Sequence, residues 1–470
     1  MPTAATPRCL DARRANFLAL QLESMSDILI VGDEVAPVCD SETAIAAAAL
    51  SRALSGAKHR VTILTLASET RAAAAPGMAR RLRTVIAHLA DGDRECPLYE
   101  GRSALSQCAL HVLGAEPIDR GHSAALLANA ASALIRDEIC RPDAIIAWGE
   151  AAAAVLPAVQ ANVRVFVLPT GTWGPPLLPA ERAALDCDAA DIAIAKGSLA
   201  GLGAVDAEVV VFPSPSSAQR FASAREFSFR ASDQAVVSVR FGCDEAPHDP
   251  ASDPDLAATF SPDSLRGKAE CRNALARRTS LALGRRTLLL ATAPLAIAEG
   301  GRLLIDTIRR ATRDDVVAVV PGDGERALVD EVKRLAVETP GKIAVYPAGP
   351  LAERQILAGA DALLLADKDN HLARSAGLAM RYGTLPLVPD CAAYHDYIVD
   401  YDTASRSGTG LLYKPDDAYE RVSVVSRCAN LRGNPDVWRP LQESLMRAAP
   451  QWAQAAAQYE ALCLSQRTPG

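Results

Sequence analysis

The chain of 470 residues is poor in aromatic side chains and has no excess of positive charge. Only 4% of its residues are Phe, Trp or Tyr, and 49 Lys and Arg face 56 Asp and Glu. A nucleic-acid partner is therefore not expected, because nothing neutralises phosphates and few rings stack on bases. Long hydrophobic runs are also lacking: the longest, roughly Leu288–Ala298, is far shorter than the ~18 residues of a membrane span. No membrane association is predicted.

Paired cysteines and clustered histidines are lacking too. Eleven cysteines are scattered from Cys9 to Cys463 without any Cys-x-x-Cys pair, and the seven histidines are equally dispersed. This pattern is typical of reduced thiols in a cytoplasmic protein, and it favours neither a disulfide framework nor a metal site. Residues 1–24 have no continuous apolar core, which argues against a secretory signal. We expect a flexible extension there.

What the chain does contain is a regular alternation of short apolar runs with alanine-rich segments of helical length. The first series predicts strands over residues 28–32, 60–66, 108–113, 143–148, 164–168, 191–195 and 208–212, and helices over 43–55, 78–89 and 123–137. Such alternation is typical of a parallel sheet covered by helices on both faces. It predicts a first domain over residues 25–235.

A polar segment rich in Asp, Pro and Ser follows at residues 230–267, and then a second series begins. This series predicts strands over residues 287–291, 316–320, 343–346, 361–365 and 385–388, and helices over 300–310, 325–335 and 373–381. The predicted fold class is therefore α/β, with two Rossmann-like doubly wound domains, 25–235 and 236–440, facing a central cleft. Residues 437–462 read as one continuous helix, and we expect residues 441–470 to pack back on the first domain.

The polar segment carries the most specific motif of the chain. "DPASDPDLAATFSPDSLRGKAECRNAL" (Asp249–Leu275) resembles the inter-domain segment of bacterial glycogen synthases and plant starch synthases. "AGADALLLADKDN" (Ala358–Asn370), "LAMRYGTLPLVPD" (Leu378–Asp390) and "IVDYD" (Ile398–Asp402), with "GTGLLYKPDD" after it, are similar to the second domain of that family.

The amino-terminal half adds to the resemblance through "ILIVGDEVAPV" (Ile28–Val38) and "PDAIIAWGEAAAAVLPA" (Pro142–Ala158). The resemblance runs in order over nearly the whole chain from Met25. It implies the GT-B arrangement and transfer of glucose from ADP-glucose to the non-reducing end of an α-1,4-glucan, with retention. It also implies that no metal and no other cofactor takes part.

The residues at the family's phosphate-binding positions differ from the family pattern. A pyrophosphate leaving group needs cations and backbone donors. The family's Lys-Thr-Gly-Gly loop falls on Cys39-Asp40-Ser41-Glu42, and its Arg and Lys pair falls on Pro294 and Glu299. Two charges ~4 Å apart interact by ~4 kcal/mol at an effective dielectric of ~20, so replacing Lys by Glu shifts the interaction by roughly twice that.

The sugar-binding positions differ as well. The glutamate of the family's Glu-Pro-x-Gly-Leu motif falls on Asn370, and the glycine of that motif falls on Ala373. The family histidine falls on Pro169. The first two residues of the family's Thr-Gly-Gly turn fall on Cys391 and Ala392. The resemblance therefore implies that no catalytic position is intact. The family's catalytic positions are occupied here by Pro169, Pro294, Glu299 and Asn370.

Three functions remain open at this point. The first is a non-catalytic or impaired homologue in α-1,4-glucan metabolism that binds glucan or a regulatory ligand, or acts as a scaffold. The second is an active retaining glucosyltransferase that uses ADP-glucose or another nucleotide sugar through a rebuilt site. The third is a protein that pairs with an active glycogen synthase or another glycogen enzyme.

Several single residues have two interpretations each. Arginines or lysines near the cleft edge could replace the lost cations or be surface-paired; these are Arg302, Lys368, Arg374 and Arg381. Trp173 could stack on a sugar or plug a hydrophobic loop. His371 and His395 have no carboxylate at a telling spacing, which favours structural or exposed roles over acid–base work.

Overall fold

A computed structural model describes residues 25–39, 41–89, 92–103, 105–116, 119–185, 195–227, 234–244, 248–284, 287–298, 300–312, 315–349, 351–367 and 374–464. The chain forms two compact units, one of Met1–Phe241 with Trp452–Gly470 and the other of Gly242–Gln451. The boundaries, after Phe241 and Gln451, thus fall six and eleven residues beyond the predicted positions 235 and 440. The extension predicted over residues 1–24 lies outside the described residues, as does nearly all of the strand predicted over 191–195.

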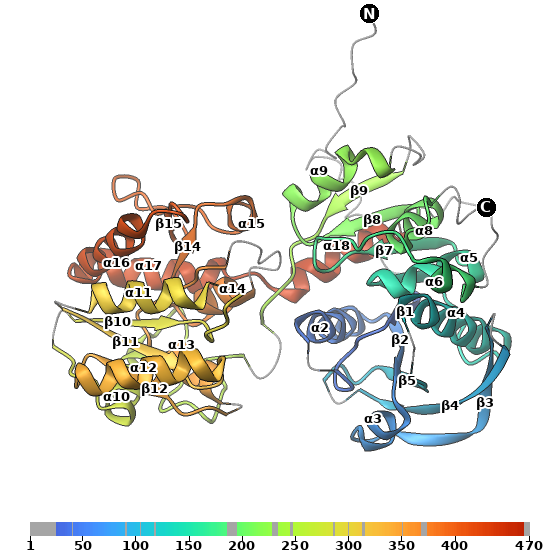
Figure 1. Ribbon diagram of the computed structural model, residues 1–470, viewed down its shortest axis with the longest axis horizontal. Coiled ribbons are helices and arrows are strands. Elements are labelled where there is room, and N and C mark those ends of the chain that lie inside the picture. The colour runs from blue at the N-terminus through green and yellow to red at the C-terminus, as the bar shows by residue number, and fades with distance from the viewer. Residues whose placement is uncertain are drawn as a thin grey trace, which may run out of the picture. The chain divides into compact units, whose positions relative to one another are not determined.

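The first unit is built on one sheet whose central strands are parallel and buried (Figure 1). Within the described residues the strand order is β3-β4-β5-β2-β1-β6-β7-β8-β9. The strands are β1 (Asp27–Gly32), β2 (Arg60–Ala67), β3 (Ala79–Leu89), β4 (Gly92–Arg102), β5 (Ala109–Gly114), β6 (Ala144–Trp148), β7 (Val163–Val167), β8 (Val209–Phe212) and β9 (Ala235–Ser238). Pairing is parallel from β5 through β9, and antiparallel between β3, β4 and β5.

Helices cover both faces of this sheet. They are α2 (Glu42–Gly56), α3 (Glu69–Ala74), α4 (Arg120–Arg136), η2 (Glu150–Ala154), α5 (Val155–Ala158), α6 (Pro179–Ala183), α8 (Leu199–Asp206), α9 (Pro215–Ser223), η3 (Arg225–Phe227) and α18 (Trp452–Leu464). Ser41 and Asp119 begin α2 and α4, because their side chains accept hydrogen bonds from backbone N–H groups of the first turn. The alanine-rich sequences let α2 and α4 pack closely on the strands, since most of their inward side chains are buried alanines.

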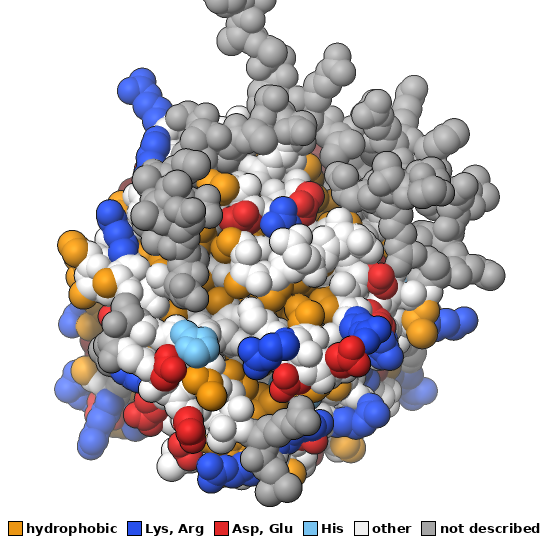
Figure 2. All heavy atoms as spheres, turned by 90° about the vertical axis from the view of Figure 1, so that its right-hand side faces the viewer, with side chains coloured by type: hydrophobic (Ala, Val, Ile, Leu, Met, Phe, Trp, Pro, Cys, Tyr) orange, Lys and Arg blue, Asp and Glu red, His pale blue; other side chains and the backbone are white. Residues whose placement is uncertain are grey.

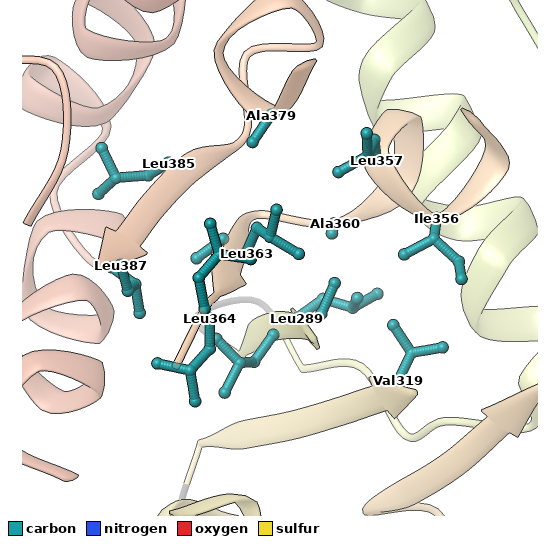
Figure 3. Close-up of a cluster of buried hydrophobic side chains, with 14 of the residues drawn as sticks. Leu289, Val319, Ile356, Leu357, Ala360, Leu363, Leu364, Ala379, Leu385 and Leu387 are labelled. Atoms are coloured by element: carbon teal, nitrogen blue, oxygen red, sulfur yellow. The ribbon is translucent and has the colours of Figure 1, made fainter. Parts of the chain in front are cut away.

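The second unit has a parallel sheet of its own. Its order is β12-β11-β10-β13-β14-β15, with β10 (Leu288–Thr292), β11 (Val316–Pro321), β12 (Ile343–Tyr346), β13 (Ala362–Leu364), β14 (Leu385–Pro389) and β15 (Leu411–Tyr413). The helices are α10 (Arg266–Thr279), α11 (Gly301–Ala311), α12 (Arg326–Glu338), α13 (Ala352–Gly359), α14 (Arg374–Arg381), α15 (Ala392–His395), α16 (Ala418–Arg432) and α17 (Pro435–Ala448). Figure 3 shows part of its core, where leucines of β13 and β14 gather with Ile356 and Leu357 of α13 and Ala379 of α14.

Two predicted elements are wrong. The segment predicted as a helix over 78–89 is the strand β3, which pairs with β4. Its burial alternates, with Val85, Ala87 and Leu89 buried and Ile86 half exposed, so its period is two and not 3.6. The continuous helix predicted over 437–462 is two helices, because α17 ends at Ala448 and Pro450 cannot continue it. The second of them, α18, packs against α2 and β7.

Candidate functional site

The strand order of the first unit places a crevice at the carboxyl ends of β1 and β6. From β1 the chain builds outward through β2 and β5 on one side, and through β6 to β9 on the other. Loops leaving such a switch point diverge to opposite faces and leave a hollow between them. A cavity of about 400 Å³ lies there, lined by the residues that follow β1, β6 and β7.

Three carboxylates line this cavity. Asp33 and Glu34 follow β1, and Glu150 follows β6. Glu34 Oε2 accepts hydrogen bonds from Ser41 Oγ at 2.5 Å and from Thr43 Oγ1 at 3.2 Å. Glu150 Oε1 accepts one from the Gly174 N–H at 2.7 Å. These hydrogen bonds hold the carboxylates of Glu34 and Glu150 in place at the wall of the pocket.

Burial makes the carboxyl groups of this pocket easier to protonate than carboxyl groups on the surface. Burial, together with the nearby charges of Glu34 and Glu150, raises the pKa of Asp33 from 3.8 to about 6. Burial also raises the pKa of Glu150, although its bond from Gly174 and the charge of Arg120 oppose the rise. The lining described here contains neither Lys nor Arg. Arg120 lies behind Gly174 and pairs with Glu181, so the three carboxylates of the lining outnumber the one nearby cation and the local field disfavours anions.

Hydroxyl and aromatic side chains form the rest of the wall. Thr170 and Thr172 lie 3.0 Å apart at their hydroxyl oxygens, and both line the cavity. The Trp148 indole N–H donates to the Thr43 carbonyl at 3.2 Å, which fixes a buried ring beneath the pocket. Carboxylates, hydroxyls and an aromatic wall together suit the alternating hydroxyl and apolar faces of a sugar.

The structure places the predicted residues of the first unit at or beside this cavity. Pro169 is buried and lines it. Ser41 caps α2 and bonds to Glu34, while Glu42 is exposed at the first position of that helix. Asp40 lies outside the described residues.

In the second unit the predicted residues follow two strands of one sheet. Pro294 is exposed in the loop after β10, and Cys391 and Ala392 open the short helix α15 after β14. Glu299, Asn370 and Ala373 lie outside the described residues. Gly300, at φ 76°, brings the loop after β10 close to that after β13, since an added Cβ would lie 3.0 Å from the Ala366 Cβ.

The structure decides between the two interpretations for some of the single residues. Arg374 and Arg381 form ion pairs with Glu353 at 3.8 Å and Asp249 at 3.0 Å, as predicted for surface-paired residues. Arg302 is exposed, and Lys368 and His371 lie outside the described residues. His395 is exposed, as predicted, but its Nε2 pairs with Asp390 Oδ1 five residues earlier, so a carboxylate partner does exist.

Trp173 has a structural role that its sequence left open. Its ring packs edge-on against Phe221 and Phe227, with centroids 5.3 and 5.4 Å away. Its indole N–H donates to Glu226 Oε1 at 2.5 Å. The ring therefore plugs the loop, as one interpretation predicted, and its remaining surface lines the cavity.

The sequence reasoning missed the carboxylates that dominate the pocket. Asp33, Glu34 and Glu150 stand directly after predicted strands, and that position was the available signal. Residues after neighbouring parallel strands meet at one sheet edge, but the strand order must be known before they can be paired.

The described residues offer neither a metal-ligand cluster nor a membrane-spanning helix beside this site. Among the described residues no group of three His, Cys, Asp or Glu side chains could hold a metal ion. Within the same part of the chain, no helix combines the length and apolar character needed to cross a membrane. The face of the first unit in Figure 2 mixes Lys and Arg with Asp and Glu over its described atoms.

Comparison with known sequences identifies relatives over about half of the chain. The glycogen synthase of Anaeromyxobacter dehalogenans is 33% identical over 226 residues, which are 47% of this chain and 47% of that protein. The glycogen synthase of Geobacillus thermodenitrificans is 29% identical over 234 residues, 49% of this chain and 48% of that protein. The match thus spans about half the length of these relatives. No protein-family model matches the chain.

Solved structures resemble the whole chain. The catalytic domain of starch synthase IV from Arabidopsis thaliana, bound to ADP and acarbose, aligns with a TM-score of 0.79 and 19% identity over 94% of this chain and 99% of that one. A sucrose-phosphate synthase from Thermosynechococcus elongatus aligns with a TM-score of 0.60 and 13% identity, over 93% of this chain and 98% of that one. The fold is therefore GT-B, with two Rossmann-like units.

Proposed function

We propose that this chain, which is similar to glycogen synthases over about half of its length and shares the fold of a starch synthase catalytic domain, binds α-1,4-glucan without transferring glucose. Its role is then that of a binding, regulatory or scaffold protein of glucan metabolism. A partner enzyme, such as an active glycogen synthase, would supply the chemistry.

One observation carries this proposal: among the described residues, the cavity at the carboxyl ends of β1, β6 and β7 is lined by three carboxylates and by no Lys or Arg. A sugar-nucleotide donor carries a diphosphate, and its departure requires stabilised negative charge. Asp33, Glu34 and Glu150 act in the opposite sense, because each repels a nearby phosphate by a Coulomb energy of up to ~4 kcal/mol at ~4 Å and an effective dielectric of ~20. Since ~1.4 kcal/mol is tenfold in rate, this field opposes transfer strongly.

The same pocket supports binding of a neutral sugar. Carboxylate oxygens accept hydrogen bonds from sugar hydroxyls, and Thr170 and Thr172 both donate and accept. The exposed part of Trp173 offers an apolar surface for a pyranose face. An uncharged glucan does not meet the repulsion that a diphosphate meets.

Calorimetric titration of the purified chain with maltoheptaose and, separately, with ADP tests this proposal. We expect heat of binding from maltoheptaose and none from ADP. Thr172→Leu, which places an apolar side chain in the exposed wall of the pocket, should weaken maltoheptaose binding. Thr70→Leu on the exposed part of α3 is the matched control and should bind as the parent does. Tight binding of ADP would refute the proposal.

A further inference from the structure

A second hollow lies at the opposite, amino-terminal edge of the first unit's sheet. It encloses about 300 Å³ and is lined by the first residues of β1 and β2, by parts of β4 and β5, and by the segment from Ile139 to Pro142 that leads into β6. Its volume is at the lower end of the range of small-molecule pockets. None of its lining residues belongs to the cavity that carries the proposed function.

The strand register explains why the sheet is hollow at this point. Arg102 of β4 lies opposite Ala109 of β5, which lies beside Thr62 of β2 and then Leu29 of β1. All four side chains project from the same face, because directly paired residues share a face. Ala109 has the smallest side chain of the four and fills the least of this row, and it lines the hollow together with Arg102 and Thr62.

The next row of the same face contributes a buried histidine. His111 lies opposite Glu100 of β4 and two residues after Ala109, and it lines the hollow. It is only 6% exposed, and its Nδ1 has no hydrogen-bond partner among the described residues. A buried polar atom without a partner costs free energy, so a ligand that gave the imidazole a hydrogen bond would recover part of that cost.

The charges around the hollow favour an anion. Three arginines line it, of which Arg60 pairs with Asp27 and Arg141 pairs with Glu138 at 2.5 Å. Arg102 Nη1 donates to the Gln107 carbonyl at 2.9 Å, and no carboxylate in the described part of the chain pairs with it. Its remaining N–H donors are therefore available, in the planar fork that matches the oxygens of a phosphate.

We propose that this hollow is a binding site for a small phosphate monoester that carries hydroxyl groups, such as a sugar phosphate. The phosphate lies against Arg102, beside Ala109, with Arg60 and Arg141 at the rim. The hydroxyl groups reach Thr62, Gln107 and the His111 imidazole. Unlike the acidic cavity at the other edge, this site takes an anion, and it goes beyond the glucan binding proposed above.

Calorimetry of the full chain at low salt tests the site with three probes: glucose 6-phosphate, inorganic phosphate and unphosphorylated glucose. We expect glucose 6-phosphate to bind more tightly than inorganic phosphate, and glucose to give no heat at this site. Arg102→Gln should weaken glucose 6-phosphate binding about tenfold or more, as expected when a charge-assisted pair is lost. Ala109→Leu should abolish binding by filling the hollow.

Arg71→Gln, which removes an exposed arginine from α3 outside the hollow, is the matched control and should bind glucose 6-phosphate unchanged. Arg102 is exposed, so its variant remains informative even if Ala109→Leu fails to fold. Absence of binding by either phosphate would overturn the proposal, and so would equal binding to the parent and to Arg102→Gln. Maltoheptaose binding should be the same in Arg102→Gln as in the parent, which separates this test from that of the acidic cavity.

Discussion

Asp33 shows how the position of one side chain changes the chemistry of a whole pocket. It stands directly after a buried strand. Burial and the charges of Glu34 and Glu150 together raise its pKa to about 6. A carboxyl group of this kind is easier to keep neutral than a surface one. The pocket is therefore suited to hydrogen-bonded neutral ligands and not to phosphates.

The raised pKa of Asp33 makes the stability of the first unit depend on pH. Between pH 3.8 and about 6 the folded carboxyl holds a proton that the unfolded one has lost, so stability falls as pH rises through this window. Asp33→Asn removes the charge and should stabilise the protein at pH 8 by at most ~3 kcal/mol, at ~1.4 kcal/mol per pKa unit. At pH 4 and below it should have almost no effect.

Denaturant unfolding followed from pH 4 to pH 8 measures this difference. Glu95→Gln, which changes an exposed carboxylate outside the pocket, serves as the control. It should change the free energy of unfolding only slightly, and by the same amount at every pH. A stabilisation by Asp33→Asn that is the same at pH 4 and pH 8 would show that charge is not its cause.

Buried ion pairs join the elements of the second unit. Asp361 immediately precedes β13 and is 2% exposed. It accepts hydrogen bonds from Arg272 Nε of α10 and Arg432 Nε of α16, both at 3.1 Å, and from the Leu289 N–H of β10 at 2.8 Å. One carboxylate thereby joins two helices to two strands. The network lies at the amino edge of the sheet, away from the loops that follow β10 and β13.

Replacing that carboxylate should weaken the second unit substantially. Asp361→Asn leaves two poorly exposed guanidinium groups without a counter-charge, and we expect a loss of ~3 kcal/mol or more in the free energy of unfolding. Asp330→Asn breaks a half-exposed pair with Lys333 and should cost less than ~1 kcal/mol. Thermal unfolding of both variants beside the parent compares the two, and equal losses would contradict this account.

The carboxyl-terminal helix offers a sharper test of packing. Tyr459 of α18 is fully buried, and its hydroxyl has no hydrogen-bond partner among the described residues. Tyr459→Phe removes that unsatisfied hydroxyl and should leave stability unchanged or raise it by ~1 kcal/mol. Tyr459→Ala should lower it by ~3–5 kcal/mol, the usual cost of emptying an aromatic site. Chemical denaturation of the two variants tests the contrast, and a destabilised Phe variant would mean that the hydroxyl is bonded.

The elements that sequence reasoning predicts well are those whose burial is complete. The parallel strands β1, β2, β6 and β7 appear as continuous apolar runs, since both faces are covered. The strand β3 was missed because an antiparallel edge strand is half exposed, and its alternation was hidden among arginines and alanines. The helix α10 was missed because it begins only at the end of the polar segment, at Arg266, and is itself rich in charged residues.

Across the whole molecule, the fold and the similarity to glycogen synthases could be predicted from local motifs, whereas the pocket could not. The motifs are contiguous in sequence, so a resemblance of the linker at Asp249–Leu275 is visible without a structure. Asp33 and Glu150 are far apart in sequence and meet only because β1 and β6 are neighbours in the sheet. The predicted cleft between the two units stays a prediction, and so does a protein partner.

The central claim is that this chain, which is similar to glycogen synthases over about half of its length, binds glucan but does not transfer glucose. Its most direct test is incorporation of labelled glucose from ADP-glucose into maltoheptaose by the purified chain, beside an active family enzyme under the same conditions. We predict incorporation no greater than in a sample without protein. Turnover clearly above that background would contradict the claim, and would mean that a set of residues other than the family's carries the charge of the leaving group.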